Sequence, residues 1–182
     1  MFEVEVKARL HDKEKVIDKL KKMGCFFGEE VHQIDHIFIP KDIKFPPPLD
    51  IPVLRIRKQN DKNFFTLKLS QSNRQDCIEH ELEISDGDKM LKIMDLINYK
   101  KVPIVNKKRI KTKFNDIEIV IDKVEDLGEF IEIERIVDEE DMLSRQKIQK
   151  ELLVFLSELG IPEKDHIPGS KYDIMLFEKF GM

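Results

Sequence analysis

The sequence has very few cysteines and no long apolar run, and both absences restrict what the protein can be. Its 182 residues include two cysteines, Cys25 and Cys77, whose spacing fits neither a disulfide framework nor a zinc site. No apolar stretch approaches the roughly 18 residues that a membrane span needs. Met1 leads directly into charged alternation rather than into a secretory leader. We therefore expect a soluble cytoplasmic protein with no membrane partner.

A strong excess of one charge is also missing. The chain has 32 Lys and Arg against 36 Asp and Glu, a formal net charge of −4, which disfavours broad binding to a nucleic-acid backbone. Charged residues still make up 37% of the chain, more than the roughly 25% of ordinary globular domains. The hydrophobic share of 41% is enough for a core, and the length predicts a single domain over residues 1–182.

Alternating apolar and charged residues predict a series of strands, and the clearest is residues 2–9. Further strands are predicted at residues 29–39, 53–58, 64–69, 78–84, 102–114, 117–123 and 129–137. Helices are predicted at residues 12–23, 86–99 and 139–159 and after Ser170. The Pro-rich segment 40–52 predicts an exposed loop, which could be a flap over a site or a plain connector.

Nearly every predicted strand carries charged side chains on one face. In a single strand, such a face would be expected to meet water. The amphipathic helices need the apolar faces of the strands, however, so the charged faces must turn away from the helices. The recurring charged positions are Glu3, Glu5 and Lys7; Arg55 and Arg57; Glu79, Glu81 and Glu83; Lys107, Arg109 and Lys111; Glu118 and Asp122; and Glu132 and Glu134.

Closure of these strands into a barrel would make the charged faces converge on one interior. An eight-stranded barrel has room inside for side chains or one small ligand, and closure also removes exposed sheet edges. Carboxylates are preferred ligands of Mg²⁺ and Mn²⁺, whereas Arg and Lys bind phosphoryl oxygens. Buried like charges are costly unless compensated, so converging faces imply a ligand. The predicted fold class is α+β, an eight-stranded antiparallel β-barrel or tunnel with helices packed on its outside.

The first strand contains Glu3-x-Glu5-x-Lys7, which resembles the signature of the CYTH, or triphosphate tunnel metalloenzyme, superfamily. Other segments match in the same order along the chain: Gln33-x-Asp35, Leu54-Arg55-Ile56-Arg57, Thr66-Leu67-Lys68, the acidic strand to Glu83, and Lys107-Lys108-Arg109. The run from Asp122 to Glu134 is similar to the penultimate hairpin of CyaB-type class IV adenylyl cyclases. Ser170-x-Tyr172 is similar to a terminal motif of that branch, and the resemblance covers residues 2–175.

The resemblance implies an antiparallel tunnel in which acidic residues hold Mg²⁺ or Mn²⁺ and basic residues hold a triphosphate. The metal ligands it implies are Glu3, Glu5, Glu132 and Glu134, supported by Asp122, with Glu81 or Glu83 a weaker candidate. The phosphate-binding residues it implies are Lys7, Arg55, Arg57, Lys68, Lys107 and Arg109. The expected catalytic residues are Glu3, Glu5, Lys7, Asp122 and Glu134.

The reaction implied first is that of a CyaB-type adenylyl cyclase, in which the ribose 3′-oxygen of ATP attacks the α-phosphate, pyrophosphate leaves and cyclic AMP forms. A triphosphatase acting on inorganic, thiamine or nucleoside triphosphate would use the same tunnel, which, if open at both ends, could admit several polyphosphates. A non-catalytic module that binds nucleotides or polyphosphate is a third interpretation. The expected partner is ATP or another triphosphate rather than nucleic acid, and a homodimer is compatible with the sequence.

Overall fold

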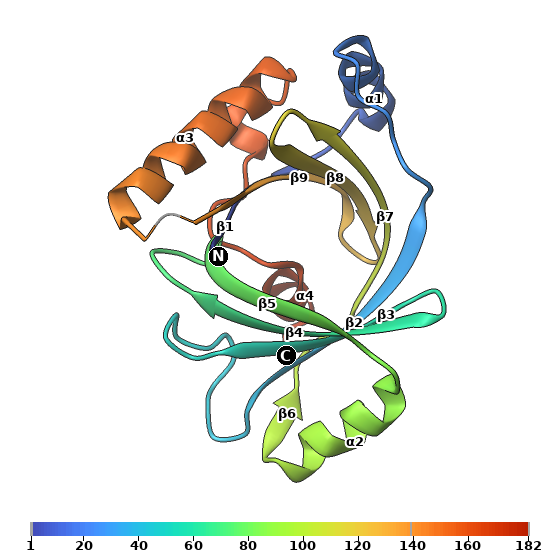
Figure 1. The fold of residues 1–182 in the computed structure, drawn as a ribbon, viewed down its shortest axis with the longest axis vertical. Helices are drawn as coiled ribbons and strands as arrows, with labels where there is room; N and C mark the ends of the chain where they lie inside the picture. The colour runs from blue at the N-terminus through green and yellow to red at the C-terminus, as the bar shows by residue number, and fades with distance from the viewer. Residues whose placement is uncertain (1, 139, 182) are drawn as a thin grey trace.

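The computed structural model describes residues 2–138 and 140–181, and its strands close into a barrel (Figure 1). The barrel strands are β1 (Phe2–Arg9), β2 (Val31–Pro40), β3 (Val53–Gln59), β4 (Lys62–Ser70), β5 (Asp76–Ile84), β7 (Val105–Phe114), β8 (Ile117–Val124) and β9 (Gly128–Val137). They pair in the order β3-β4-β5-β1-β9-β8-β7-β2, and β2 pairs back with β3. Every pairing is antiparallel. The predicted eight-stranded antiparallel barrel is confirmed.

The α-helices are α1 (Lys13–Lys22), α2 (Gly87–Leu96), α3 (Met142–Glu158) and α4 (Tyr172–Phe180), and a short 3-10 turn covers Glu163–Asp165. Three of them begin at an aspartate whose carboxylate accepts a backbone N–H of the first turn, as Asp12 does from Lys15 at 3.1 Å. Such caps satisfy donors that have no partner inside the helix. No helix within the described part of the chain is both long and apolar enough to cross a membrane.

The apolar face of the barrel wall packs against the helices outside it, as the strand alternation predicts. Val4 and Val6 of β1 form one core with Leu20 of α1 and with Leu152 and Leu156 of α3. On another side of the barrel, α2 covers β2 and β3, and Met94 packs there among apolar side chains of both strands. Figure 1 shows α1 and α3 beside β8 and β9 and shows α2 beside β6. The charged side chains on the opposite strand faces are thereby left inside the barrel.

Helix α4 lies across one end of the barrel instead of on its outer wall (Figure 1). Its side chains Tyr172 and Leu176 pack with Ile37, Val105 and Phe130 of the barrel strands. The Pro-rich loop adds to this end, because the ring of Phe45 packs edge-on against Phe177 with 5.0 Å between centroids. Helix α4 and this loop therefore cover one end of the barrel interior.

The segment after α2 differs from the prediction at two points. Asn98 has a positive φ of 68°, so the chain leaves the helical path before Tyr99. Tyr99–Lys101 then form the short strand β6, which pairs with the end of β2, whereas the sequence placed Tyr99 in the helix. Pro103 lacks a backbone N–H and interrupts the predicted strand 102–114, so that β7 begins only at Val105.

Replacing Leu156 with Ala tests the packing of α3 on the barrel. The Leu156 side chain is fully buried, so the cavity left by Leu156→Ala should cost about 2 to 5 kcal/mol of unfolding free energy. Val154 lies on the same helix but is 59% exposed, and Val154→Ala should change stability by less than about 0.5 kcal/mol. Urea unfolding of both variants measures the difference, and equal losses would contradict the packing.

Candidate functional site

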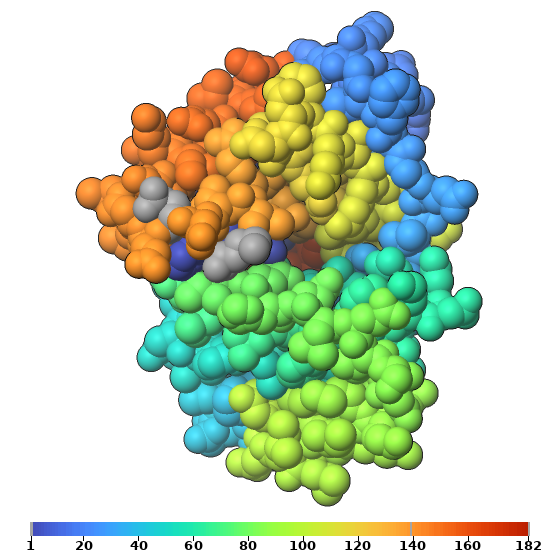
Figure 2. Space-filling model, viewed as in Figure 1, coloured from blue at the N-terminus to red at the C-terminus, as the bar shows by residue number. Residues whose placement is uncertain are grey.

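The cavity inside the barrel has a volume of about 420 Å³ and a strongly charged lining. Its nine basic lining residues are Lys7, Arg55, Arg57, Lys68, Arg74, Lys107, Arg109, Lys111 and Lys171. Its nine acidic lining residues are Glu3, Glu5, Asp35, Glu79, Glu81, Glu118, Glu132, Glu134 and Asp173. Figure 2 shows the mouth as a hollow between the green and the yellow-to-orange strands, with the dark red of α4 visible inside. The lining therefore contains as many acidic as basic residues.

Strand order decides which charges face each other across the cavity. In the closed barrel, β9 and β3 are four strands apart in both directions, and so are β7 and β5. Strand β9 contributes acidic lining residues, among them Glu134, and the opposite strand β3 contributes Arg55 and Arg57. Likewise, β5 contributes Glu79, and the opposite strand β7 contributes basic residues such as Arg109. Acidic and basic walls thus oppose each other across one small space.

Three carboxylates come together near the start of β1. Glu5 pairs with Glu134 across the β1–β9 ladder, and Glu3 lies two residues away on the same face. One carboxylate oxygen of each residue lies within 4.8 Å of those of the other two. Burial, together with the charges of Glu3, Glu118 and Glu5, raises the pKa of Glu134 to about 8. Clustered carboxylates, one of them with a raised pKa, fit a divalent cation, which prefers oxygen ligands and would favour their ionised forms.

Glu132 and Asp122 are deeper in the barrel, and Arg109 holds both. The Arg109 guanidinium donates to Glu132 Oε2 at 2.6 Å and, through Nε, to Asp122 Oδ1 at 2.6 Å. Lys7 and Lys107 complete this cluster, each with its Nζ 3.1 Å from a carboxylate oxygen. Burial would raise the pKa of Glu132, but the charges of Lys7 and Arg109 outweigh it and hold that pKa well below its usual range. The metal roles of Glu132 and Asp122 stay predictions.

The other cations implied to bind phosphate also have carboxylate partners within the protein. Arg57 binds Asp35 through two bonds of 2.7 and 2.8 Å. The guanidinium of Arg55 contacts Glu79 at 3.2 Å and Glu81 at 2.9 Å, and Lys68 contacts Glu3 at 2.9 Å as well as Glu79. Glu83 is 54% exposed and pairs with Lys62 instead. Glu81 and Glu83 thus lie apart from the three-carboxylate cluster.

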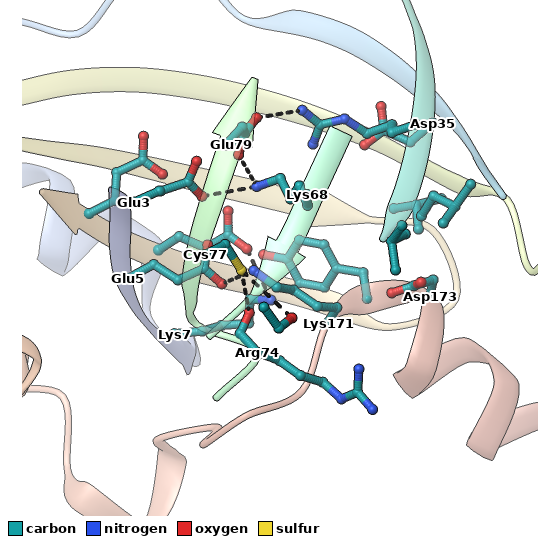
Figure 3. A pocket seen from close by; sticks show the side chains of 18 of the residues that line it. Glu3, Glu5, Lys7, Asp35, Lys68, Arg74, Cys77, Glu79, Lys171 and Asp173 are labelled. Atoms are coloured by element: carbon teal, nitrogen blue, oxygen red, sulfur yellow. Dashed lines mark hydrogen bonds and ion pairs between the residues drawn. The ribbon is translucent and has the colours of Figure 1, made fainter. Parts of the chain in front are cut away.

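Helix α4 and its N-cap residue Lys171 supply site residues to which the sequence alone assigned no role. Lys171 Nζ lies 2.7 Å from Glu5 Oε1, and Figure 3 shows the two side chains meeting in the cavity. The ring of Tyr172 lies 4.0 Å from Lys7 Nζ. The one available signal was the Ser170-x-Tyr172 motif, which marks the segment but not its contacts. Cys77 also lines the cavity, whereas Cys25 belongs to the apolar core outside the barrel.

Comparisons with known proteins agree on the fold and on the family. Residues 1–170 match the CYTH domain family. A protein of Methanocaldococcus jannaschii, provisionally named an adenylate cyclase, is 35% identical over 174 residues, which cover 94% of this chain and 97% of that protein. A solved structure from Pyrococcus horikoshii is 28% identical with a TM-score of 0.80, covering 97% of this chain and 99% of that chain. A Hippeastrum structure has a TM-score of 0.59 at 19% identity, covering 100% and 96%.

Substituting Glu134 with Gln tests whether the three-carboxylate cluster binds a divalent cation. A saturating ligand of the native state adds stability, about 2.7 kcal/mol at 100 times its dissociation constant. Mg²⁺ or Mn²⁺ should therefore raise the melting temperature of the wild-type protein, and Glu134→Gln should lose most of that rise. Without metal the variant should be at least as stable as wild type, because it removes repulsion with Glu3, Glu5 and Glu118.

The matched control is Glu83→Gln, which neutralises an exposed carboxylate outside the cluster and should keep the full rise with metal. Differential scanning calorimetry with and without metal measures all three proteins. An equal rise in Glu134→Gln and wild type, or no rise in wild type, would contradict the assignment.

Proposed function

The chain belongs to the CYTH domain family, and on that premise we propose that it is a metal-dependent enzyme acting on a triphosphate inside its barrel. One observation carries the proposal. Glu3, Glu5 and Glu134 cluster in a cavity that Arg55 and Arg57 also line. Carboxylates and arginines are the groups that bind divalent cations and phosphoryl oxygens, respectively. Both kinds of group face one space that is large enough for a small ligand.

The charge balance of the lining supports a metal requirement. Basic lining residues such as Lys7, Arg57 and Arg109 already pair with carboxylates of the protein, so little positive charge is left to neutralise a triphosphate. A divalent cation that enters with the substrate would offset part of the phosphate charge. The three-carboxylate cluster is the place where the lining can hold such a cation. Mg²⁺ and Mn²⁺ suit these oxygen ligands.

In this proposal, each group of residues has its own role. Glu3, Glu5 and Glu134 would hold the metal ion, which when bound neutralises phosphate charge and activates an oxygen nucleophile. Arg55 and Arg57 would bind phosphoryl oxygens on the facing wall. Their carboxylate partners fix both guanidinium groups before a substrate arrives. Fixed donors of this kind stabilise charge that develops in the transition state, because they need little reorganisation.

The leading reaction is the cyclisation of ATP to cyclic AMP and pyrophosphate. The 35% identity with the Methanocaldococcus jannaschii protein, which is provisionally named an adenylate cyclase, supports it. The basic residues deep in the barrel, Lys7, Lys107 and Arg109, would bind the polyphosphate and stabilise pyrophosphate as it leaves. Phosphoryl chemistry of this type depends chiefly on positioning and on charge stabilisation, and the barrel supplies both.

Hydrolysis of a triphosphate is the second candidate reaction. The Hippeastrum protein, which shares the fold, is described as having a dominant triphosphatase activity. The same residues would hold the polyphosphate in either reaction, since they recognise phosphoryl oxygens rather than a nucleobase. The two reactions differ in the nucleophile, which is the ribose 3′-oxygen for cyclisation and water for hydrolysis.

Product analysis distinguishes the two reactions. The purified protein is incubated separately with ATP, inorganic tripolyphosphate and thiamine triphosphate, in Mg²⁺ or in Mn²⁺, and the products are resolved by mass spectrometry. A cyclase yields cyclic AMP and pyrophosphate from ATP, whereas a triphosphatase yields a diphosphate and inorganic phosphate. We expect cyclic AMP with at least one metal and none in EDTA.

Two outcomes would contradict parts of this proposal. If neither metal yields cyclic AMP while a triphosphate is hydrolysed, the cyclase assignment is wrong and the triphosphatase stands. If no triphosphate reacts under any condition, the enzymatic proposal itself fails.

A further inference from the structure

The hydroxyl group of Tyr172 is buried in the barrel without a hydrogen-bond partner. Tyr172 is 5% exposed, and its Oη finds no partner anywhere in residues 2–138 and 140–181. Most buried polar groups in native proteins are hydrogen-bonded, because an unpaired one loses its bonds to water and gains nothing. An unpaired hydroxyl in the lining of a cavity therefore indicates a missing partner.

The Tyr172 ring is fixed beneath two of the cations implied to bind phosphate. Lys7 Nζ lies 4.0 Å from the ring centroid and Lys107 Nζ lies 5.1 Å from it. The ring of Phe130 packs beside it at 5.1 Å between centroids. Lys7 also donates to the carbonyl of Ser170 at 3.1 Å, which ties β1 to the start of α4. The ring position is thus set by contacts that do not involve the hydroxyl.

The surroundings of the hydroxyl contain donors, and the nearby acceptors are already engaged. Lysine and arginine side chains carry no acceptor. Asp122 and Glu132 act electrostatically on the hydroxyl, but their oxygens bind Arg109, Lys7 and Lys107. Burial, reinforced by these two carboxylates, holds the pKa of Tyr172 well above its usual range. The hydroxyl therefore keeps its proton and remains a donor.

We propose that Tyr172 is a substrate-binding residue whose hydroxyl donates a hydrogen bond to a phosphoryl oxygen of the polyphosphate chain. The inference rests on the proposed function, because it requires a triphosphate in the cavity. A phosphoryl oxygen bound by Lys7 and Lys107 would lie near Tyr172, because both ammonium groups already contact the Tyr172 ring. This contact involves the phosphates alone, so it applies to ATP and to inorganic triphosphate alike.

The composition of the chain allows a direct spectroscopic test. The protein has two tyrosines and no tryptophan, so Tyr99→Phe leaves Tyr172 as the sole source of the tyrosine absorption band. Tyr99 lies on β6, outside the cavity lining, which also makes Tyr99→Phe the matched control for loss of a hydroxyl. The Tyr99→Phe protein is titrated with inorganic tripolyphosphate in Mg²⁺ while the near-ultraviolet difference spectrum is recorded.

Calorimetric titration of the same ligand into wild type, Tyr99→Phe and Tyr172→Phe gives the affinities. We expect a tyrosine difference band that saturates at the calorimetric dissociation constant. Tyr172→Phe should bind tripolyphosphate about tenfold more weakly, as expected for loss of one hydrogen bond to a charged group. Tyr99→Phe should bind like wild type. The unliganded melting temperature of Tyr172→Phe should not fall, because the lost hydroxyl has no partner and the ring contacts remain.

Each other outcome overturns the inference in an identifiable way. Wild-type affinity in Tyr172→Phe would exclude the hydrogen bond, even if the spectrum changes, since the ring alone would then be responding. A lower unliganded melting temperature would show that the hydroxyl has a partner within the protein. If tripolyphosphate binds none of the proteins in Mg²⁺ or Mn²⁺, the proposed function fails and this inference fails with it.

Discussion

Closure of the sheet through the pairing of β2 with β3 is the constraint on which the rest of the structure depends. The seam runs from Gln33 opposite Gln59 to Phe38 opposite Leu54. If the sheet were open, its charged faces could meet water on one side, but the closed barrel turns them into a shared interior where charge must be compensated. The seam itself shows the compensation, because Asp35 and Arg57 are directly opposite and form a bidentate ion pair.

Ion pairs compensate most of the lining, including Glu3 with Lys68 and Glu5 with Lys171. Glu134 differs, because an acidic residue lies opposite it on each neighbouring strand. Arg109, Lys7 and Lys107 neutralise the acidic residues deep in the barrel. Near the start of β1, burial and then the charges of its acidic neighbours raise the pKa of Glu134. The three-carboxylate cluster therefore favours the addition of positive charge. The Arg and Lys side chains beside it in the lining are suited to bind phosphate. A metal–triphosphate complex would place its metal ion at the carboxylates and its phosphates beside the basic side chains.

Much of this fold could be predicted from the sequence, because strand alternation and helix capping are local signals. Each predicted barrel strand exists. Because nearly every predicted strand had one charged face, the sequence also predicted that the sheet closes into a barrel, and it does. Local signals cannot say which carboxylate meets which cation, since that depends on register between distant strands. For this reason the resemblance could name both Glu132 and Glu134 as metal ligands but could not show that Arg109 binds the first and that the second lies with Glu3 and Glu5. The position of α4 across the barrel could not be predicted either, because it depends on packing against residues of distant strands, such as Ile37 and Phe130.

The location of a bound metal ion tests the central claim most directly. Crystals grown with Mn²⁺ and a non-hydrolysable ATP analogue would give an anomalous difference map at the manganese absorption edge. The account predicts a manganese peak coordinated by Glu3, Glu5 and Glu134, with the triphosphate extending from it toward Arg55 and Arg57. A triphosphate bound without manganese at these carboxylates, or manganese bound only elsewhere, would contradict it.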